Sequence, residues 1–252
     1  MSNDPRPVAL VTGASYGLGA AIAEKLASDG FDAAVTELDP ADLSDTLAAI
    51  EAAGGQSLGV ALDLKSNESI AASASAVLER FGRIDLLVNN AAMLLAKPAL
   101  DVAADEFEAV MRINVTGTYV MTQHVARHLI EAGRPGQIIN IASTFTTIGA
   151  VNVSPYGISK AAIGGLVRHL AAEWAPHNIR VNAVAPGTSM TKLRAEIMAN
   201  DPARRDAGLA KIPLGRFTEP ADIAGAVSYL ASPAAAYVTG HVLAVDGGMT
   251  VT

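Results

Sequence analysis

The sequence predicts an α/β protein built on a doubly wound parallel sheet of about seven strands, with helices on both faces. Short, almost continuously apolar runs alternate with segments of helical periodicity along the whole chain. Such runs are typical of parallel strands that are buried on both faces. No linker, low-complexity tract or internal repeat divides the 252 residues. We therefore expect residues 1–252 to form a single domain.

The first half of the chain contains four predicted strands, each followed by a predicted helix. The strands are Val8–Val11, Asp32–Val35, Ser57–Leu62 and Ile84–Val88, and the helices are Gly17–Ser28, Pro40–Ala53, 66–81 and about 105–131. In the first helix, Leu18, Ile22 and Leu26 recur at the spacing of one apolar helix face.

The second half continues the alternation. Its strands are Gln137–Ile141, Ile179–Val184 and Val242–Val245, its helices are 155–175 and Pro220–Ala231, and two short polar helices are expected within 189–211. Because parallel strands joined by helices cross over in the right-handed sense, this alternation predicts a Rossmann-like arrangement.

The composition limits the classes of function. The formal net charge is −7, and the charges are not gathered in blocks, which disfavours nucleic acid and anionic membranes as partners. There is no cysteine, which excludes disulfides, thiolate catalysis and cysteine-bound zinc. The uncharged stretches 135–159 and 223–245 are interrupted by Pro, Gly, Ser and Thr, unlike membrane spans. We expect a soluble cytoplasmic protein without a bound metal.

A glycine-rich loop joins the first predicted strand to the first predicted helix. It reads Thr12-Gly13-Ala14-Ser15-Tyr16-Gly17-Leu18-Gly19. Glycines allow phosphates to approach the backbone closely, and the helix N-terminus offers free N–H groups to a pyrophosphate. A P-loop is excluded because no Lys-Ser/Thr pair follows. The loop therefore predicts a dinucleotide site that includes Gly13, Ser15, Tyr16, Gly17, Leu18 and Gly19.

Glu37 lies at the carboxyl end of the second predicted strand, 18 residues after Gly19, close to the spacing of about 20 residues that is usual for a ribose-binding acidic residue. An acidic residue in this place accepts hydrogen bonds from the ribose hydroxyls of NAD. Tyr16 and Leu38 supply no cation for a 2′-phosphate, so NAD is expected rather than NADP. The alternative is that Asp39 binds the ribose and Glu37 is a solvated turn residue.

The segment Ser154-Pro155-Tyr156-Gly157-Ile158-Ser159-Lys160 places a tyrosine and a lysine one helical turn apart. Ser154 is expected to cap this helix and Pro155 to take its first position. A phenol is a poor base at neutral pH, but an ammonium on the same helix face stabilises its phenolate. Tyr156 is thus a candidate general acid/base. The alternative is an ordinary surface pair of tyrosine and lysine.

Other unusual residues follow predicted strands. Asn89-Asn90-Ala91 follows the fourth strand, Ser143 the fifth and Pro186-Gly187 the sixth. Asn114 lies within a predicted helix, where asparagine is disfavoured. Ligands of doubly wound sheets bind at the carboxyl ends of the strands, so we expect these residues to gather near Tyr156.

Together these segments resemble the short-chain dehydrogenase/reductase family over essentially the full chain. The matching segments, in the family's order, are Thr12-Gly13-x3-Gly17-x-Gly19, Asp63-Leu64, Asn89-Asn90-Ala91, Asn114, Ser143, Tyr156-x3-Lys160, Pro186-Gly187-x3-Thr191 and Val245-Asp246-Gly247-Gly248. The resemblance implies an oxidoreductase that transfers a hydride between NAD(H) and a secondary alcohol or ketone, with no need for a metal.

The resemblance also implies a role for each residue. Tyr156 would be the acid/base, Lys160 would assist it and hold the nicotinamide ribose, Ser143 would orient the substrate oxygen, and Asn114 would hold a water. The implied cofactor contacts are Asp63 and Leu64 at the adenine, Asn89 and Ala91 at the adenosine side, and Ser189 and Thr191 at the nicotinamide carboxamide. Pro186 and Gly187, after the sixth strand, are also implied to bind the cofactor.

Two further expectations come from the same resemblance. Ala92 stands where the family usually has glycine, which adds a methyl group near the nicotinamide ribose. Members of the family are commonly tetramers that pack through two long helices, here about 105–131 and 155–175, so we expect a homotetramer.

Substrate contacts are expected from 93–96, from 144–153 and from a mobile lid at 188–212. The first two segments contain mostly apolar residues with some Thr and Asn and neither Arg nor Lys, which disfavours a strongly anionic substrate. The lid, however, contains Arg194, Arg204 and Arg205, so an anionic substrate is not excluded. A polyol or sugar-like alcohol and a cyclic or acyl-type ketone remain alternatives.

Two other functions compete with this one. An NADPH-dependent 3-oxoacyl-type ketone reductase is opposed by the charge of Glu37. A non-catalytic dinucleotide-binding sensor or scaffold would be expected to lack Ser143, Tyr156 or Lys160, and all three are present.

Overall fold

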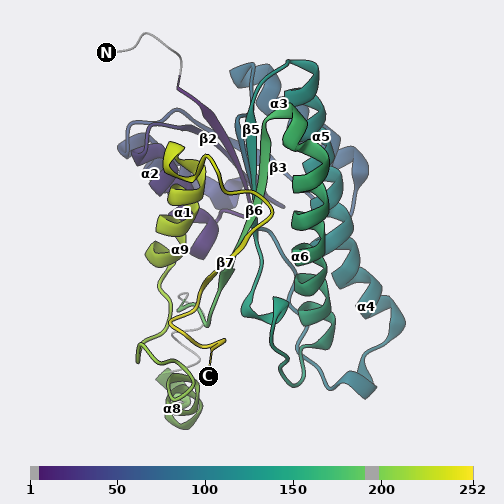
Figure 1. Cartoon of the computed structure of the whole chain (residues 1–252), viewed down its shortest axis with the longest axis vertical. Coiled ribbons are helices and arrows are strands. Elements are labelled where there is room, and N and C mark those ends of the chain that lie inside the picture. The colour runs from purple at the N-terminus through teal and green to yellow at the C-terminus, as the bar shows by residue number, and fades with distance from the viewer. Residues whose placement is uncertain (1–5, 191–198, 252) are drawn as a thin grey trace.

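Seven parallel strands form a single sheet in the computed structural model, which describes residues 6–190 and 199–251 (Figure 1). The strands are β1 Val8–Thr12, β2 Asp32–Glu37, β3 Ser57–Ala61, β4 Leu86–Asn89, β5 Gly136–Ile141, β6 Ile179–Pro186 and β7 Val242–Val245. Their order is β3-β2-β1-β4-β5-β6-β7. The order reverses between β1 and β4, so a crevice opens at their carboxyl ends. The predicted doubly wound parallel sheet is confirmed.

Helices cover both faces of the sheet, as Figure 1 shows. One layer consists of α1 Gly17–Ser28, α2 Ser44–Ala52 and α9 Pro220–Ala231, and the other of α3 Asn67–Phe81, α4 Ala104–Met111, α5 Thr118–Glu131 and α6 Ser154–Trp174. The short helix α8 Pro202–Leu209 lies beyond the sheet, near the C-terminus. Among the described helices, none is both long and apolar enough to cross a membrane.

The two layers bury opposite sides of the same strands. Along β1, Leu10 packs with residues of α3, α5 and α6, whereas Ala9 and Val11 pack with residues of α1 and α9. Because successive side chains of a strand point to opposite faces, a strand between two helical layers buries both of its faces and is apolar at most positions. This explains the continuous apolar runs in the sequence.

The predicted helix 105–131 is interrupted. It consists of α4, a π-helical turn Arg112–Gly117 and α5. Gly117 is pressed against the loop after β3, since an added Cβ would lie 2.5 Å from the carbonyl oxygen of Leu64. The predicted helix 40–53 is also divided, into a 3₁₀ turn Pro40–Leu43 and α2.

Part of the predicted lid is described. Residues 191–198 lie outside the described residues, and with them Arg194, Thr191 and part of the first of the two predicted short helices. Ser189 forms a β-bridge with Thr218, and α8 corresponds to the second short helix.

Candidate active site

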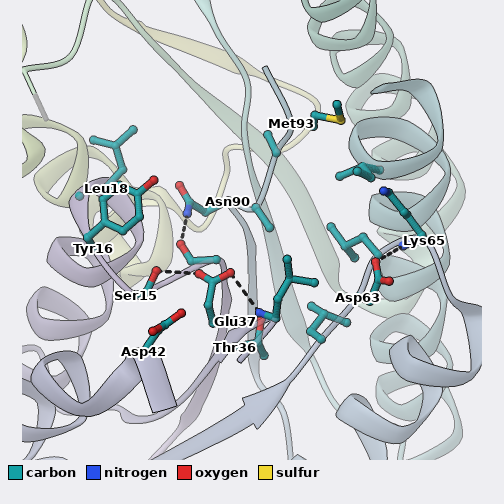
Figure 2. Close-up of a pocket in the computed structure, with 18 residues that line it drawn as sticks. Ser15, Tyr16, Leu18, Thr36, Glu37, Asp42, Asp63, Lys65, Asn90 and Met93 are labelled. Atoms are coloured by element: carbon teal, nitrogen blue, oxygen red, sulfur yellow. Dashed lines mark hydrogen bonds between the residues drawn. The ribbon is translucent and has the colours of Figure 1, made fainter. Parts of the chain in front are cut away.

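A groove of about 670 Å³ lies at the carboxyl ends of β1, β2, β3 and β4 (Figure 2). The glycine loop, the end of β2 and the loops after β3 and β4 form its walls. Nine of the residues predicted to bind a dinucleotide line it: Gly13, Ser15, Tyr16, Gly17, Leu18, Glu37, Asp63, Leu64 and Ala91. Its position is the crevice where the strand order reverses.

The N-terminus of α1 faces this groove without a side-chain cap. Tyr16 is the N-cap residue, its side chain makes no capping hydrogen bond, and the first turn carries no acidic residue. Gly13 and Gly17 adopt left-handed backbone angles, with φ of 65° and 66°, that disfavour other residues. The free N–H groups and the positive end of the helix dipole therefore fit a pyrophosphate.

Asn90 and Thr12 fix the glycine loop. Asn90 was expected to lie near Tyr156, but neither residue was assigned a cofactor contact. The Nδ2 of Asn90 donates to the carbonyl oxygen of Gly13 at 2.7 Å and to that of Thr12 at 3.1 Å. Thr12 Oγ1 accepts from the backbone N–H groups of Asn90 and Ala91. Gly19 does not line the groove; a Cβ there would collide with the Gly13 carbonyl and lie 2.7 Å from Asn90 Nδ2. The absence of a side chain at Gly19 thus allows helix α1 to pack closely against the glycine loop.

Asn89 was expected at the adenosine, and the structure directs its side chain elsewhere. Its Nδ2 donates to Thr122 Oγ1 at 2.9 Å and to Asn140 Oδ1 at 3.0 Å, inside the layer of α5 and β5. Asn90 lines the groove instead, because adjacent residues at the end of a strand point in opposite directions. The structure therefore does not bring the Asn89 side chain to the groove.

Glu37 is held with its carboxylate at the edge of the groove. Its Oε2 accepts from Ser15 Oγ at 2.7 Å and its Oε1 from the backbone N–H of Leu38 at 3.0 Å (Figure 2). Asp39 accepts from the N–H of Ala41 and caps the 3₁₀ turn Pro40–Leu43. Asp39 does not line the groove, so the geometry favours Glu37 of the two acidic residues.

A cation also borders the groove. Lys65 lies beside Asp63, away from Ser15 and Glu37, and its backbone N–H donates to Asp63 Oδ1 at 2.8 Å (Figure 2). The prediction that no cation faces the cofactor rested on positions 16 and 38 alone, so Lys65 was missed. Glu37 and Lys65 therefore lie at different parts of the groove, Glu37 beside Ser15 and Lys65 beside Asp63.

A second cavity of about 240 Å³ adjoins the first, and Leu18, Asn90 and Ala92 line both. The predicted residues gathered there are Ser143, Tyr156, Lys160, Pro186, Gly187 and Ser189, while Thr191 lies outside the described residues. Phe145 and Met249 add apolar surface. The predicted catalytic tyrosine, lysine and serine therefore share one cavity next to the groove.

Lys160 is buried, with 4% of its surface exposed. Its Nζ donates to the carbonyl oxygen of Ile141 at 2.6 Å and lies 5.6 Å from the centre of the Tyr156 ring. Burial lowers the pKa of Lys160 from 10.5 to about 8, because the charged form loses its hydration. A lysine cation close to the phenol is the arrangement that the sequence predicted.

The rest of this cavity is shaped by short local contacts. The Tyr156 ring meets the Phe145 ring edge-on, with 6.0 Å between centroids. Ser143 Oγ accepts from the N–H of Phe145 at 3.2 Å, which leaves the hydroxyl hydrogen to be donated elsewhere. Ser154 does not cap α6 as predicted: it is the first helical residue, Val153 is the N-cap residue, and no side chain caps this end.

Asn114 lines neither the groove nor the cavity. It is 2% exposed, and its amide binds the backbone of Met93, accepting from N–H at 2.7 Å and donating to C=O at 2.9 Å. Its Nδ2 also donates to Ser159 Oγ at 2.9 Å. Ser159 was not predicted as a site residue, although it stands between Tyr156 and Lys160. Within the described part of the chain, no cluster of three His, Asp or Glu side chains could hold a metal.

Comparison with known proteins identifies the family. The family model described as Enoyl-(Acyl carrier protein) reductase matches residues 13–250. The 2-dehydro-3-deoxy-D-gluconate 5-dehydrogenase of Escherichia coli is 38% identical over 96% of this chain and 94% of its own. The 3beta-hydroxysteroid dehydrogenase 1 of Eggerthella lenta is 39% identical over 96% of this chain and 93% of its own.

A crystal structure described as a 2-deoxy-D-gluconate 3-dehydrogenase from Agrobacterium tumefaciens, with bound NADP, superposes with a TM-score of 0.89. It is 36% identical and covers 98% of this chain and 97% of its own. The relatives are named as dehydrogenases of chemically different substrates, a sugar acid and a steroid, and the fold of the solved relative matches the fold of this chain. The chain belongs to the short-chain dehydrogenase/reductase family and is an oxidoreductase that acts on CH–OH groups.

Proposed function

We propose that this oxidoreductase interconverts a secondary alcohol and a ketone with NAD(H), using Tyr156 as the general acid/base. The observation that carries the proposal is the juxtaposition of Tyr156, Lys160 and Ser143 in one cavity, directly beside a groove that fits a dinucleotide. When bound, the dinucleotide accepts or supplies the hydride. The side chains then need only to hold the substrate and move one proton.

Each side chain has a defined part in that proton transfer. Ser143 donates its hydroxyl hydrogen to the substrate oxygen and orients it. In the direction of oxidation, the phenolate of Tyr156 takes the proton of the alcohol; in reduction, the phenol returns a proton to the ketone oxygen. The cation of Lys160, 5.6 Å from the ring centre, stabilises the phenolate by its charge.

The preference for NAD over NADP rests on Glu37. Its carboxylate is fixed by Ser15 Oγ and by the N–H of Leu38, so it is poised to accept from ribose hydroxyls and to repel a 2′-phosphate. Lys65 borders the same groove, but beside Asp63. The relative from Agrobacterium tumefaciens was solved with NADP, so both coenzymes are compared in the titration below.

Substitution of Tyr156 tests the chemistry. Tyr156→Phe should lower turnover by about 10³-fold, within the range of general acid/base catalysis, and leave NADH binding unchanged. Tyr237→Phe is the matched control, because Tyr237 is fully exposed and lines neither the groove nor the cavity. The assay follows NADH absorbance over a panel of secondary alcohols and ketones. Wild-type-like turnover of Tyr156→Phe would refute the assignment.

Titration of NADH and NADPH by fluorescence tests the cofactor. The wild type should bind NADH at least about tenfold more tightly than NADPH, and Glu37→Gln should remove most of that difference by deleting the charge. Asp39→Asn, which deletes the neighbouring charge outside the groove, should keep the preference. If NADPH binds more tightly to the wild type, the NADPH-dependent 3-oxoacyl-type reductase becomes the better description.

We also propose a cytoplasmic homotetramer that packs through α5 and α6. Tyr119 and Ile130 of α5 expose apolar surface, and they border a shallow groove with Arg127, Glu131 and Glu173, which offers charges of both signs to a second copy. Light scattering at micromolar concentration should give the mass of four chains. The mass of one chain would refute this packing.

A further inference from the structure

The π-helical turn Arg112–Gly117 contacts three parts of the site: the loop after β3, the segment at Met93 and helix α6. Arg112 donates to the carbonyl oxygen of Lys65 at 2.8 and 3.0 Å, in the loop at the Asp63 side of the groove. Gly117 packs directly on Leu64 of the same loop. Between them, the side chain of Asn114 is directed into the protein. Single π turns of this kind often occur at functional sites.

The orientation of the Asn114 amide is fixed by its partners. The backbone N–H of Met93 can only donate, so it must meet Oδ1, and the carbonyl of Met93 must meet Nδ2. The second hydrogen of Nδ2 is donated to Ser159 Oγ. Met93 lines the dinucleotide groove, so one amide connects the wall of the groove to helix α6.

Ser159 completes this connection. It is 0% exposed, accepts from Asn114 Nδ2 at 2.9 Å, and donates its hydrogen to the carbonyl oxygen of Tyr156 at 2.7 Å. A hydroxyl has one hydrogen, so the direction of both bonds is determined. An unbroken chain of hydrogen bonds runs from Met93 through Asn114 and Ser159 to the backbone of Tyr156.

We infer that Ser159 is a positioning residue, which sets the first turn of α6, and with it the Tyr156 phenol, relative to the loop at Met93. This rests on the proposed function, in which Tyr156 transfers the proton. Ser159 touches neither the groove nor the cavity, so its effect must pass through Asn114 and Tyr156. Displacements of about 1 Å at reacting groups are enough to lower rates substantially.

Ser159→Ala tests the inference, with Ser73→Ala as its matched control. Ser73 is also a buried serine on a helix, but its hydroxyl has no hydrogen-bond partner. Four quantities are measured for each variant: kcat, the dissociation constant of NADH, the melting temperature, and the rate of amide hydrogen exchange in the segment around Met93. Ser159→Thr retains the hydroxyl and serves as the conservative variant.

The inference predicts that Ser159→Ala lowers kcat at least about tenfold while the affinity for NADH changes less than about twofold. Exchange around Met93 becomes faster, Ser73→Ala behaves as wild type, and Ser159→Thr recovers most of kcat. A kcat within about twofold of wild type overturns the inference. It is also overturned if kcat, NADH affinity and melting temperature fall together and threonine restores none of them.

Failure of the proposed function would look different. In that case the wild type itself would show no turnover that depends on Tyr156. The rate of hydrogen exchange around Met93 would then be the measurement that tests whether Ser159 positions α6 relative to this segment. Unchanged exchange around Met93 in Ser159→Ala would then overturn the inference, and faster exchange would support it.

Discussion

Raising the pH should stabilise the wild-type protein relative to a Lys160→Met variant. Burial lowers the pKa of Lys160 from 10.5 to about 8, so between these values the unfolded chain binds more protons than the folded one. The free energy of unfolding therefore rises with pH in this window. Below about pH 8 the folded protein bears the full penalty of a buried ammonium, and the penalty disappears as the pH approaches 10.5.

The size of the effect follows from the two pKa values. At about 1.4 kcal/mol per pH unit, the whole penalty is about 3 kcal/mol, and about 2 kcal/mol of it should be relieved between about pH 7 and about pH 9.5. Lys160→Met keeps the length of the side chain and removes the titrating group. Subtracting its free energy of unfolding from that of the wild type removes the contributions of all other groups that titrate equally in both proteins.

Urea unfolding of both proteins without cofactor, at one protein concentration and at several pH values, measures this difference. The reasoning is refuted if the difference stays constant within about 0.5 kcal/mol over this range, or if it falls as the pH rises. A constant difference would mean that Lys160 is hydrated or paired with a negative charge in the folded protein. Its cation would then be stabilised by something other than the Ile141 carbonyl.

Three further predictions concern packing and charge. Gly117→Ala should lower the free energy of unfolding by about 1–3 kcal/mol because the new methyl meets Leu64; unchanged urea unfolding would contradict the close approach. Gly19→Ala should weaken NADH binding at least about tenfold by displacing the glycine loop, and a fluorescence titration with wild-type affinity would contradict it. The hydrogen bond from Arg216 lowers the pKa of Asp222 from 3.8 to about 2. The ionised carboxylate therefore stabilises the fold above pH 3.8, and this stabilisation is lost as the pH falls toward 2. Because Arg216 is more than half exposed, Asp222→Asn should cost only about 0.5–1 kcal/mol near pH 7; urea unfolding that shows an equal loss near pH 2 would contradict the linkage.

The sequence allowed the sheet to be predicted well because burial on both faces makes most strands predominantly apolar. Helices α1 and α9 begin and end where their patterns predicted, and so does β7. The π-helical turn was not foreseen, because one extra residue in a turn hardly alters the apolar periodicity over a long helix. Asn114, an unusual residue within a helix, was the indication that the helix is interrupted there.

The site was predicted less completely than the fold. Ser143, Tyr156 and Lys160 share a cavity as expected, since strand ends and the first turn of a helix bring them together. The sequence alone could not show which of the two adjacent asparagines, Asn89 or Asn90, faces the groove. Their side chains point in opposite directions, and which one reaches the groove depends on where β4 ends. Ser159 was passed over because only three-dimensional contacts reveal its bonds to Asn114 and Tyr156.

The hydrogen bond between Ser15 and Glu37 has a consequence for any redesign of the proposed preference for NAD. Ser15 Oγ donates its hydrogen bond to the Glu37 carboxylate. Replacing Glu37 by a residue that is neutral and accepts no hydrogen bond therefore deletes a negative charge and also frees a hydroxyl donor at the same place. If Glu37 binds the ribose hydroxyls as proposed, the released donor would be available to a 2′-phosphate at that ribose. A redesign toward the phosphorylated coenzyme therefore begins with a pair of linked positions, and Ser15 should be retained when Glu37 is changed.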